Sequence, residues 1–89
     1  MTLNEVIFID SLPKLDLHGY DRMSAKVAIN EYINDNIKMG NEIILIVHGI
    51  GLGILKEATH NFLKNNKKVI EYKLNNFNSG CTMVKIRLK

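Results

Sequence analysis

The hydrophobic pattern changes period along the chain, and these changes predict an α/β domain. Leu15-Asp16-Leu17-His18 alternates strictly between apolar and polar residues, which is typical of a short strand over 15–18. Apolar residues then recur every four positions from Ala25 to Ile37, which predicts a helix over 22–39. Asp21 is placed to cap the start of this helix, and Gly40 is placed to end it.

The centre of the chain is a continuous apolar run followed by a glycine-rich turn. The run Ile43–Val47 predicts a strand buried on both faces. His48 ends this strand, and glycines follow at positions 49, 51 and 53 before a second helical pattern begins at Ile54. A strand, a tight turn and a helix in succession direct several backbone N–H groups at one point, which favours an anion-binding site.

Two more strands are predicted in the last third of the chain, over Val69–Leu74 and Thr82–Leu88, with a polar turn between them. The predicted order is β-α-β-α-β-β, which forms a four-stranded mixed sheet in which the last two strands are antiparallel. Right-handed crossovers would place both helices on one face of this sheet. Residues 1–14, with a short apolar run at Val6–Ile9, are predicted to form an N-terminal arm or edge strand preceding a domain over 15–89.

Composition and charge narrow the class of protein. A chain of 89 residues is one domain, and it contains no apolar run near the roughly 20 residues of a membrane span and no secretory signal. The lone Cys81 cannot form an internal disulfide and reads as a small strand residue, so we expect a cytoplasmic protein. Residues 1–44 carry four Lys/Arg against seven acids, whereas residues 45–89 carry eight against two. This asymmetry favours an anionic partner, although a solvated surface explains it equally well.

Candidate chemistry gathers at the predicted ends of the first two strands. Asp16 and His18 are two apart on a strand and share a face, and His48 ends the neighbouring parallel strand at the same edge of the sheet. A carboxylate, two imidazoles and a set of N–H donors are groups that phosphodiester cleavage requires. Each also has a structural explanation. Asp16 could cap a backbone group, His18 could close a turn, His48 could pack at a strand end, and the glycines could serve only the bend.

Other motifs do not fit. Ile54 stands where the dinucleotide-binding fingerprint needs a small residue, and neither a Walker A pattern nor zinc-ligand spacing occurs. His60 lies on the second predicted helix and is expected to be a solvated surface residue.

Two sequence motifs, and the distance between them along the chain, resemble those of the Smr (small MutS-related) domain. They are L-D-L-H-G at 15–19 and H-G-x-G-x-G at 48–53, followed by L-K at 55–56 and a closing S-G-C-T-M-V at 79–84. The resemblance covers residues 15–88 and implies a two-layer α/β sandwich similar to the C-terminal domain of the third bacterial translation initiation factor. It also implies that the last strand lies antiparallel within an otherwise parallel four-stranded sheet.

The resemblance further implies DNA nicking or RNA cleavage, so we expect an endonuclease that binds DNA or RNA. It assigns catalysis to Asp16 and His18 through the L-D-x-H motif, and to His48 through the H-G-x-G motif. It assigns nucleic-acid binding to the turn and to the basic residue that follows, which here are Gly49, Gly51, Gly53 and Lys56. Mg²⁺ and Mn²⁺ are the candidate cofactors, and Asp16 is the candidate ligand.

The turn departs from the usual family pattern, and this departure leaves a second hypothesis open. The family commonly has G-K-G-T-G, whereas Ile50 and Leu52 here replace the lysine and the threonine. Both substitutions remove polar contacts to a phosphate while leaving the glycine positions unchanged. The alternative function is therefore a non-catalytic module that binds RNA, the ribosome or a partner protein through this apolar turn.

Overall fold

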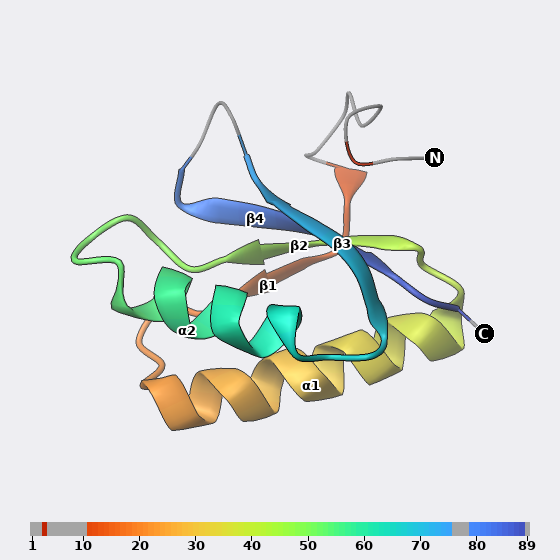
Figure 1. Ribbon diagram of the computed structural model, residues 1–89, viewed down its shortest axis with the longest axis horizontal. Helices are drawn as coiled ribbons and strands as arrows, with labels where there is room; N and C mark the ends of the chain where they lie inside the picture. The colour runs from red at the N-terminus through yellow and green to blue at the C-terminus, as the bar shows by residue number, and fades with distance from the viewer. Residues whose placement is uncertain (1–2, 4–10, 76–78, 89) are drawn as a thin grey trace.

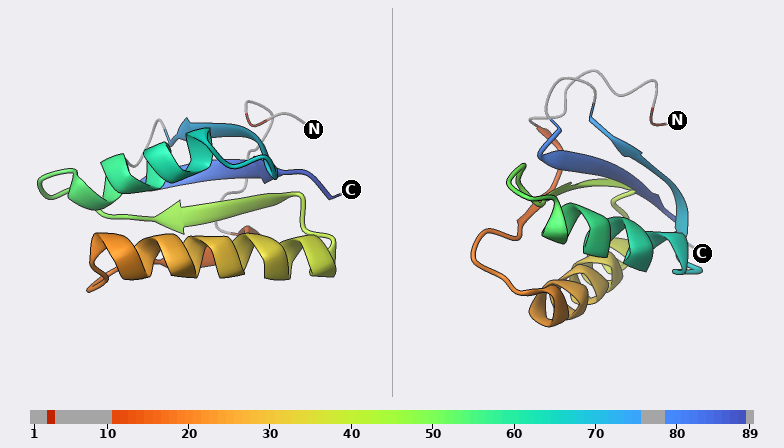
Figure 2. Two further views of the ribbon diagram at one scale, coloured as in Figure 1. Left: turned by 60° about the horizontal axis from the view of Figure 1, so that its bottom comes forward. Right: turned by 60° about the vertical axis from the view of Figure 1, so that its left-hand side comes forward.

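Two helices lie side by side on one face of a four-stranded sheet (Figures 1 and 2). This computed structural model describes Leu3, residues 11–75 and residues 79–88, so the predicted strand at Val6–Ile9 lies outside the described residues. The order of elements is the predicted one: β1 (Lys14–Asp16), α1 (Arg22–Met39), β2 (Ile43–Val47), α2 (Ile54–Lys64), β3 (Val69–Leu74) and β4 (Cys81–Ile86).

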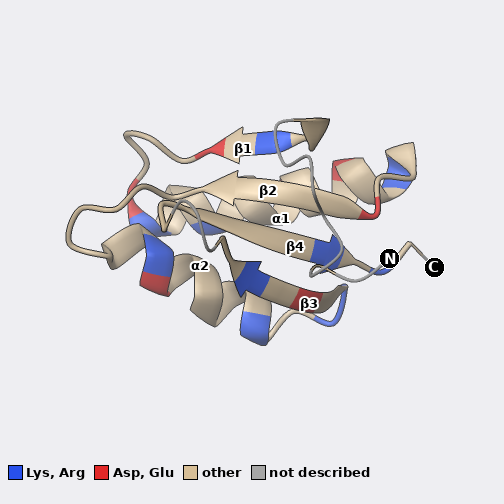
Figure 3. Ribbon diagram, turned by 90° about the horizontal axis from the view of Figure 1, so that it is seen from above, with Lys and Arg blue, Asp and Glu red and all other residues tan. Residues whose placement is uncertain are grey.

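The strand order across the sheet is β1-β2-β4-β3 (Figure 3). β1 pairs in parallel with β2, and β4 runs antiparallel to both of its neighbours. The last strand is thus inserted against the direction of the other three, which confirms the predicted α/β sandwich. The parallel pair β1 and β2 is the part of the sheet that matters for the site, because both of its carboxyl ends lie at one edge.

The first helix is bounded as its sequence predicted. The Asp21 carboxylate accepts a hydrogen bond from the Ser24 N–H at 2.7 Å, and the Ser24 hydroxyl oxygen accepts one from the Asp21 N–H at 3.2 Å. Gly40 ends the helix in the left-handed conformation, with φ of 77°. The side chains between the layers form the main core: Leu17, Ala25, Ile29, Ile33, Ile44, Ile46, Leu63, Val84 and Ile86.

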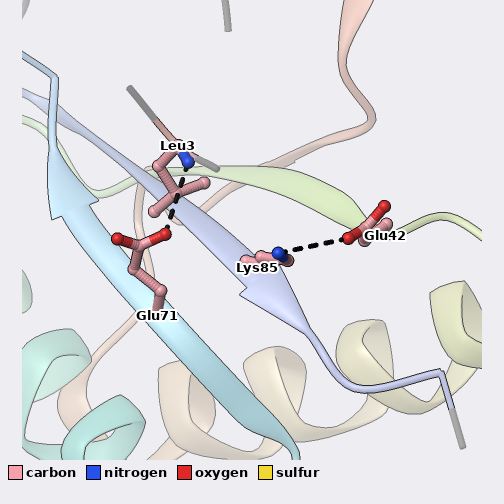
Figure 4. Close-up of polar contacts among 4 residues, drawn as sticks. All are labelled: Leu3, Glu42, Glu71 and Lys85. Atoms are coloured by element: carbon pink, nitrogen blue, oxygen red, sulfur yellow. Dashed lines mark hydrogen bonds and ion pairs between the residues drawn. The ribbon is translucent and has the colours of Figure 1, made fainter. Parts of the chain in front are cut away.

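The helix-free face of the sheet carries a second, smaller cluster. Ile43, Leu45, Cys81 and Met83 are buried there together with Leu3, which is only 1% exposed. The Leu3 N–H donates to Glu71 at 3.3 Å, and Lys85 forms an ion pair with Glu42 at 3.4 Å (Figure 4). Burial raises the pKa of the Cys81 thiol, in keeping with its predicted role as a small strand residue.

Two strand boundaries differ from the prediction. The first strand was expected to reach residue 18 but ends at Asp16, because the chain turns after Leu17 and the Tyr20 N–H donates to the Leu17 carbonyl at 3.0 Å. The last strand begins at Cys81 and ends at Ile86, rather than running from 82 to 88. Among the described residues, no helix is both long and apolar enough to span a membrane.

Candidate functional site

The ends of β1 and β2 bring the two sequence motifs together at one edge of the sheet. Asp16 is paired with Val47, and the Leu17 N–H donates to the Val47 carbonyl at 2.9 Å. His48 therefore directly follows the last paired residue of β2, and His18 follows that of β1 after one residue, Leu17. Both turns leave the sheet on the same side (Figure 3).

Asp16 and His18 form an exposed turn. The Asp16 Oδ1 atom accepts a hydrogen bond from the His18 backbone N–H at 2.9 Å, so the carboxylate fixes the position of the following histidine. Gly19, in the left-handed region with φ of 81°, continues the turn. Both side chains are exposed, and among the described residues neither the His18 ring nor the Asp16 Oδ2 atom has a hydrogen-bond partner. These two groups are therefore accessible to a ligand.

His48 lies in a different environment, because its side chain is only 6% exposed. Its Nδ1 atom lies 2.9 Å from the Gly49 carbonyl oxygen, and its Nε2 atom lies 2.8 Å from the Thr82 hydroxyl. A carbonyl can only accept, so Nδ1 carries the proton and the neutral ring accepts at Nε2 from Thr82. Both ring nitrogens are thus used within the protein, which is the packing role that the sequence left open for this residue.

His60 completes this hydrogen-bonded chain, and its predicted position on the surface is wrong. Its Nε2 atom lies 2.8 Å from the same Thr82 hydroxyl, and its ring packs edge-on to His48 at 5.9 Å and against Tyr72 at 5.2 Å. Since Thr82 donates to His48, its hydroxyl oxygen must accept from His60. The direction of every bond in the chain His60–Thr82–His48–Gly49 is therefore determined.

The charge state of the buried His48 ring and the half-buried His60 ring follows from their surroundings. Burial is the main cause that lowers the pKa of His48, and the nearby Lys56 ammonium lowers it further, against the opposing effect of the bond to Gly49. Burial also lowers the pKa of His60, with added contributions from His48 and Lys56. Both rings are consequently neutral near pH 7, and a neutral His48 is the state in which its Nε2 atom can accept from Thr82. The half-buried Lys56 supplies the positive charge beside them.

The glycine turn provides backbone donors, but fewer than the sequence suggested. The N–H groups of His48 and Gly49 both donate to the Gly80 carbonyl, at 2.9 and 3.0 Å, and the Gly53 N–H donates to Ile50 at 3.1 Å. In the described structure, no partner is found for the amides of residues 50–52 or 54–56, whereas the Glu57 N–H donates to the Gly53 carbonyl at 2.9 Å. The anion-binding capacity is therefore confined to the amides of residues 50–52 and 54–56, and it excludes the amides of Gly49 and Gly53, which are bonded within the protein.

All three glycines of the turn have a positive φ angle, namely 81° at Gly49, 34° at Gly51 and 79° at Gly53. A Cβ atom at any of them would meet nothing within 4 Å, so backbone conformation alone explains the need for glycine here. The side chains between them are strongly exposed, 68% for Ile50 and 93% for Leu52. Residues 48–55 line a hollow of about 330 Å³ over the turn.

Candidate metal ligands are few. Within the described parts of the chain, no group of three or more His, Cys, Asp or Glu side chains is arranged to hold a metal ion. Asp16 offers at this edge a carboxylate oxygen that has no hydrogen-bond partner among the described residues. This donor set fits Mg²⁺ or Mn²⁺ held jointly by one carboxylate, waters and substrate phosphate oxygens, rather than a site built entirely from protein ligands.

Thr82 is the residue that sequence reasoning missed. It shares a face of its strand with Val84 and Ile86, and that face is buried against the helices. A polar side chain at a buried strand position needs a hydrogen-bond partner. This pattern was the available signal that Thr82 binds another polar group, although it did not identify His48 and His60.

The comparisons with known proteins agree with the fold. The sequence model of the Smr domain matches residues 15–87. Endonuclease MutS2 of Helicobacter pylori is 38% identical over 73 residues, which are 82% of this chain and 10% of that protein. The chain thus spans about a tenth of the length of the curated relatives it matches.

Two solved structures share the architecture. The Smr domain of Thermus thermophilus MutS2 superposes with a TM-score of 0.82 at 23% identity, covering 85% of this chain and 99% of that one. YdaL, a stand-alone small MutS-related protein from Escherichia coli, superposes with a TM-score of 0.77 at 20% identity, covering 83% and 63%. At these identities the likeness establishes the fold, and the chemistry has to be argued from the site.

Proposed function

This chain belongs to the Smr domain family, and from that premise we propose that it binds nucleic acid and cleaves the phosphodiester backbone. The observation that carries the proposal is the exposed pair Asp16 and His18 at the same sheet edge as a turn with unpaired amides. The name of the Helicobacter pylori relative, endonuclease MutS2, supports the same reaction class.

His18 is the proposed acid–base group. Its ring is exposed and has no hydrogen-bond partner among the described residues, so it can exchange a proton with a reacting oxygen. Asp16 holds the His18 backbone through Oδ1, and its Oδ2 atom has no hydrogen-bond partner among the described residues, so it can contact a ligand. A divalent ion, if bound by this oxygen, would polarise the phosphate.

The turn is the proposed phosphate contact. The unpaired amides of residues 50–52 and the uncapped first turn of α2 present N–H donors and the positive end of a helix dipole. Lys56 adds a positive charge on the same element. Such donors stabilise charge that develops on a phosphate oxygen during cleavage.

His48 receives a positioning role in this proposal, in place of the acid–base role expected from the sequence. Its bonds to Gly49 and Thr82 tie the first residue of the turn to β4. The ring thereby fixes the backbone from which the phosphate-binding amides project. A group with both nitrogens occupied has no free site at which to accept a substrate proton.

Incubation of the purified protein with labelled single-stranded RNA and with supercoiled DNA tests the proposal, with and without Mg²⁺ or Mn²⁺. We expect cleavage by the wild type and a loss of about 10²- to 10⁴-fold for His18→Ala. Asp16→Asn keeps an oxygen that can accept from the His18 N–H but removes the negative charge. It therefore distinguishes the contribution of the turn's geometry to cleavage from that of the carboxylate charge. Equal rates for the wild type and His18→Ala would contradict the catalytic assignment.

A second candidate function rests on the exposed Ile50 and Leu52. Two apolar side chains at the tip of the turn favour a non-catalytic module that binds RNA, the ribosome or a partner protein. Binding measured over a range of salt concentrations separates the two functions. Phosphate-driven binding weakens steeply as salt rises, whereas apolar contact with a protein does not.

A further inference from the structure

A groove of about 740 Å³ lies between α1 and α2, on the exposed side of the helical layer. Its lining begins at Arg22 and Ile54, the first residues of the two helices, and reaches Lys67 beyond the end of α2. The two helices run side by side in the same direction (Figures 1 and 2). The groove therefore follows the full length of α2, about 16 Å at 1.5 Å per residue.

The charge of the groove is positive. Arg22, Lys26 and Lys67 line it against a single carboxylate, that of Glu57. None of these three cations forms an ion pair with another described residue. An excess of unpaired positive charge along a concave strip is complementary to a chain of phosphates.

The floor of the groove is apolar and its walls are rich in carboxamides. Phe62 and Ala58 are half-buried there, and Phe62 also packs against the main core, which holds its ring in place. The side chains of Asn30 and Asn61 are exposed and have no hydrogen-bond partner among the described residues. An aromatic surface beside free carboxamides, which both donate and accept, matches the face and the edge of an unpaired base.

The groove is continuous with the candidate cleavage site. Ile54 lines both the groove and the hollow over the glycine turn. Arg22 follows His18 by four residues and begins the helix after that turn. A strand with one phosphate at the turn can therefore continue between the two helices without leaving the surface.

From these observations we propose that the groove between α1 and α2 binds a single-stranded segment of nucleic acid adjoining the cleaved phosphate. The inference rests on the proposed function and adds the form of the substrate to it. In a duplex the bases are paired and stacked, so they cannot reach a recessed aromatic ring, whereas the bases of a single strand can. Stacking on Phe62 and charge contacts to Lys26 and Lys67 tolerate many sequences, and the carboxamides supply modest base preference.

The test is a binding titration by fluorescence anisotropy on the His18→Ala background, which suppresses cleavage. The probes are a labelled 12-nucleotide RNA, the DNA of the same sequence, and the duplex of that DNA. We expect Lys26→Glu to weaken single-strand binding on the order of tenfold and Asn61→Ala to weaken it by roughly threefold. Lys38→Glu is the matched control, because it reverses an exposed charge on the same helix outside the groove.

The outcomes separate the two proposals. If the protein binds and cleaves single strands while Lys26→Glu and Lys38→Glu behave alike, the groove assignment is overturned and the proposed function stands. If only duplex binding responds to Lys26→Glu, the single-strand assignment is wrong. If no probe binds and the wild type cleaves none of the substrates, the proposed function fails as well. Comparison of the RNA and DNA probes identifies which strand the groove accepts.

Discussion

The two histidine–glycine turns of this molecule share a local sequence and differ in almost everything else. His18-Gly19 and His48-Gly49 each follow a strand of the same parallel pair, and both glycines have φ of 81°. Yet the ring of His18 is exposed without a partner among the described residues, whereas His48 is 6% exposed with both nitrogens bonded. Similar motifs at one sheet edge therefore lie in different environments.

The difference follows from the position of each strand in the sheet. Among the described strands, β1 lies at the edge of the sheet and pairs with β2, whereas β2 lies between β1 and β4. His48 continues the alternation of Ile44 and Ile46, which face the helices, and there it meets Thr82. Asp16, paired with Val47, belongs to the opposite face. The two histidines therefore differ because His48 falls at a strand position that faces the helices, whereas His18 follows a residue on the opposite face. We propose that the first positions the turn and that the second is free to react.

The largest expected effect on stability comes from removing the buried ring. His48→Ala removes the acceptor of the Thr82 hydroxyl proton and the donor to the Gly49 carbonyl, and it opens a cavity, so we expect a loss of about 2–4 kcal/mol of unfolding free energy. His18→Ala removes an exposed ring and should change stability by less than about 0.5 kcal/mol. Urea denaturation of both variants measures the contrast. Equal losses would contradict the division of roles.

Thr82 offers a second test of the difference between the two turns, because its hydroxyl bonds to His48 and not to His18. Thr82→Val keeps the side-chain shape but removes the hydroxyl between His48 and His60, which should cost about 1–3 kcal/mol. Thr59→Val is the matched control, because the buried Thr59 hydroxyl has no hydrogen-bond partner within the described part of the chain. We expect this control to be neutral or stabilising in thermal melts. If the two valine variants lose the same stability, the hydrogen-bonded chain contributes nothing.

The backbone of the two turns should respond alike. Gly19→Ala and Gly49→Ala each force a side chain into the left-handed region without any clash, which costs about 1–2 kcal/mol. Calorimetric melting of both variants checks this equality. A near-zero cost at Gly19 alone would mean that the exposed turn adjusts its backbone, and only the His48 turn would then be rigid.

The smallest effect is the pH dependence of stability. The folded-state pKa values of His48 and His60 lie below the ordinary value of 6.5, so the unfolded chain binds protons first as the pH falls. The free energy of unfolding should therefore decrease from about pH 6.5 down through the lowered folded pKa values. The double variant His48→Gln/His60→Gln should show a shallower decrease over this range. An unchanged slope in chemical denaturation at several pH values would count against buried neutral rings.

The sequence was sufficient for the architecture and for the meeting of the two motifs. Period changes, the capping residue Asp21 and the run Ile43–Val47 determine the elements, because local propensity and burial agree there. The environment of His48 could not be predicted in the same way, since it depends on a contact with Thr82 of β4. Thr82 lies 34 residues later in the chain than His48. The role of Phe62 in the groove was also invisible, because its spacing marks only the core-facing side of α2.

The division of roles between His18 and His48 is tested most directly by the long-range ¹⁵N–¹H NMR spectrum of the imidazole rings. The spectrum is recorded with and without a non-cleavable oligonucleotide. We predict that His48 keeps the pattern of a neutral ring protonated at Nδ1, while the ring signals of His18 shift as the oligonucleotide is added. Large shifts at His48 with unchanged signals at His18 would contradict the claim that His18 contacts the substrate and that His48 only positions the glycine turn.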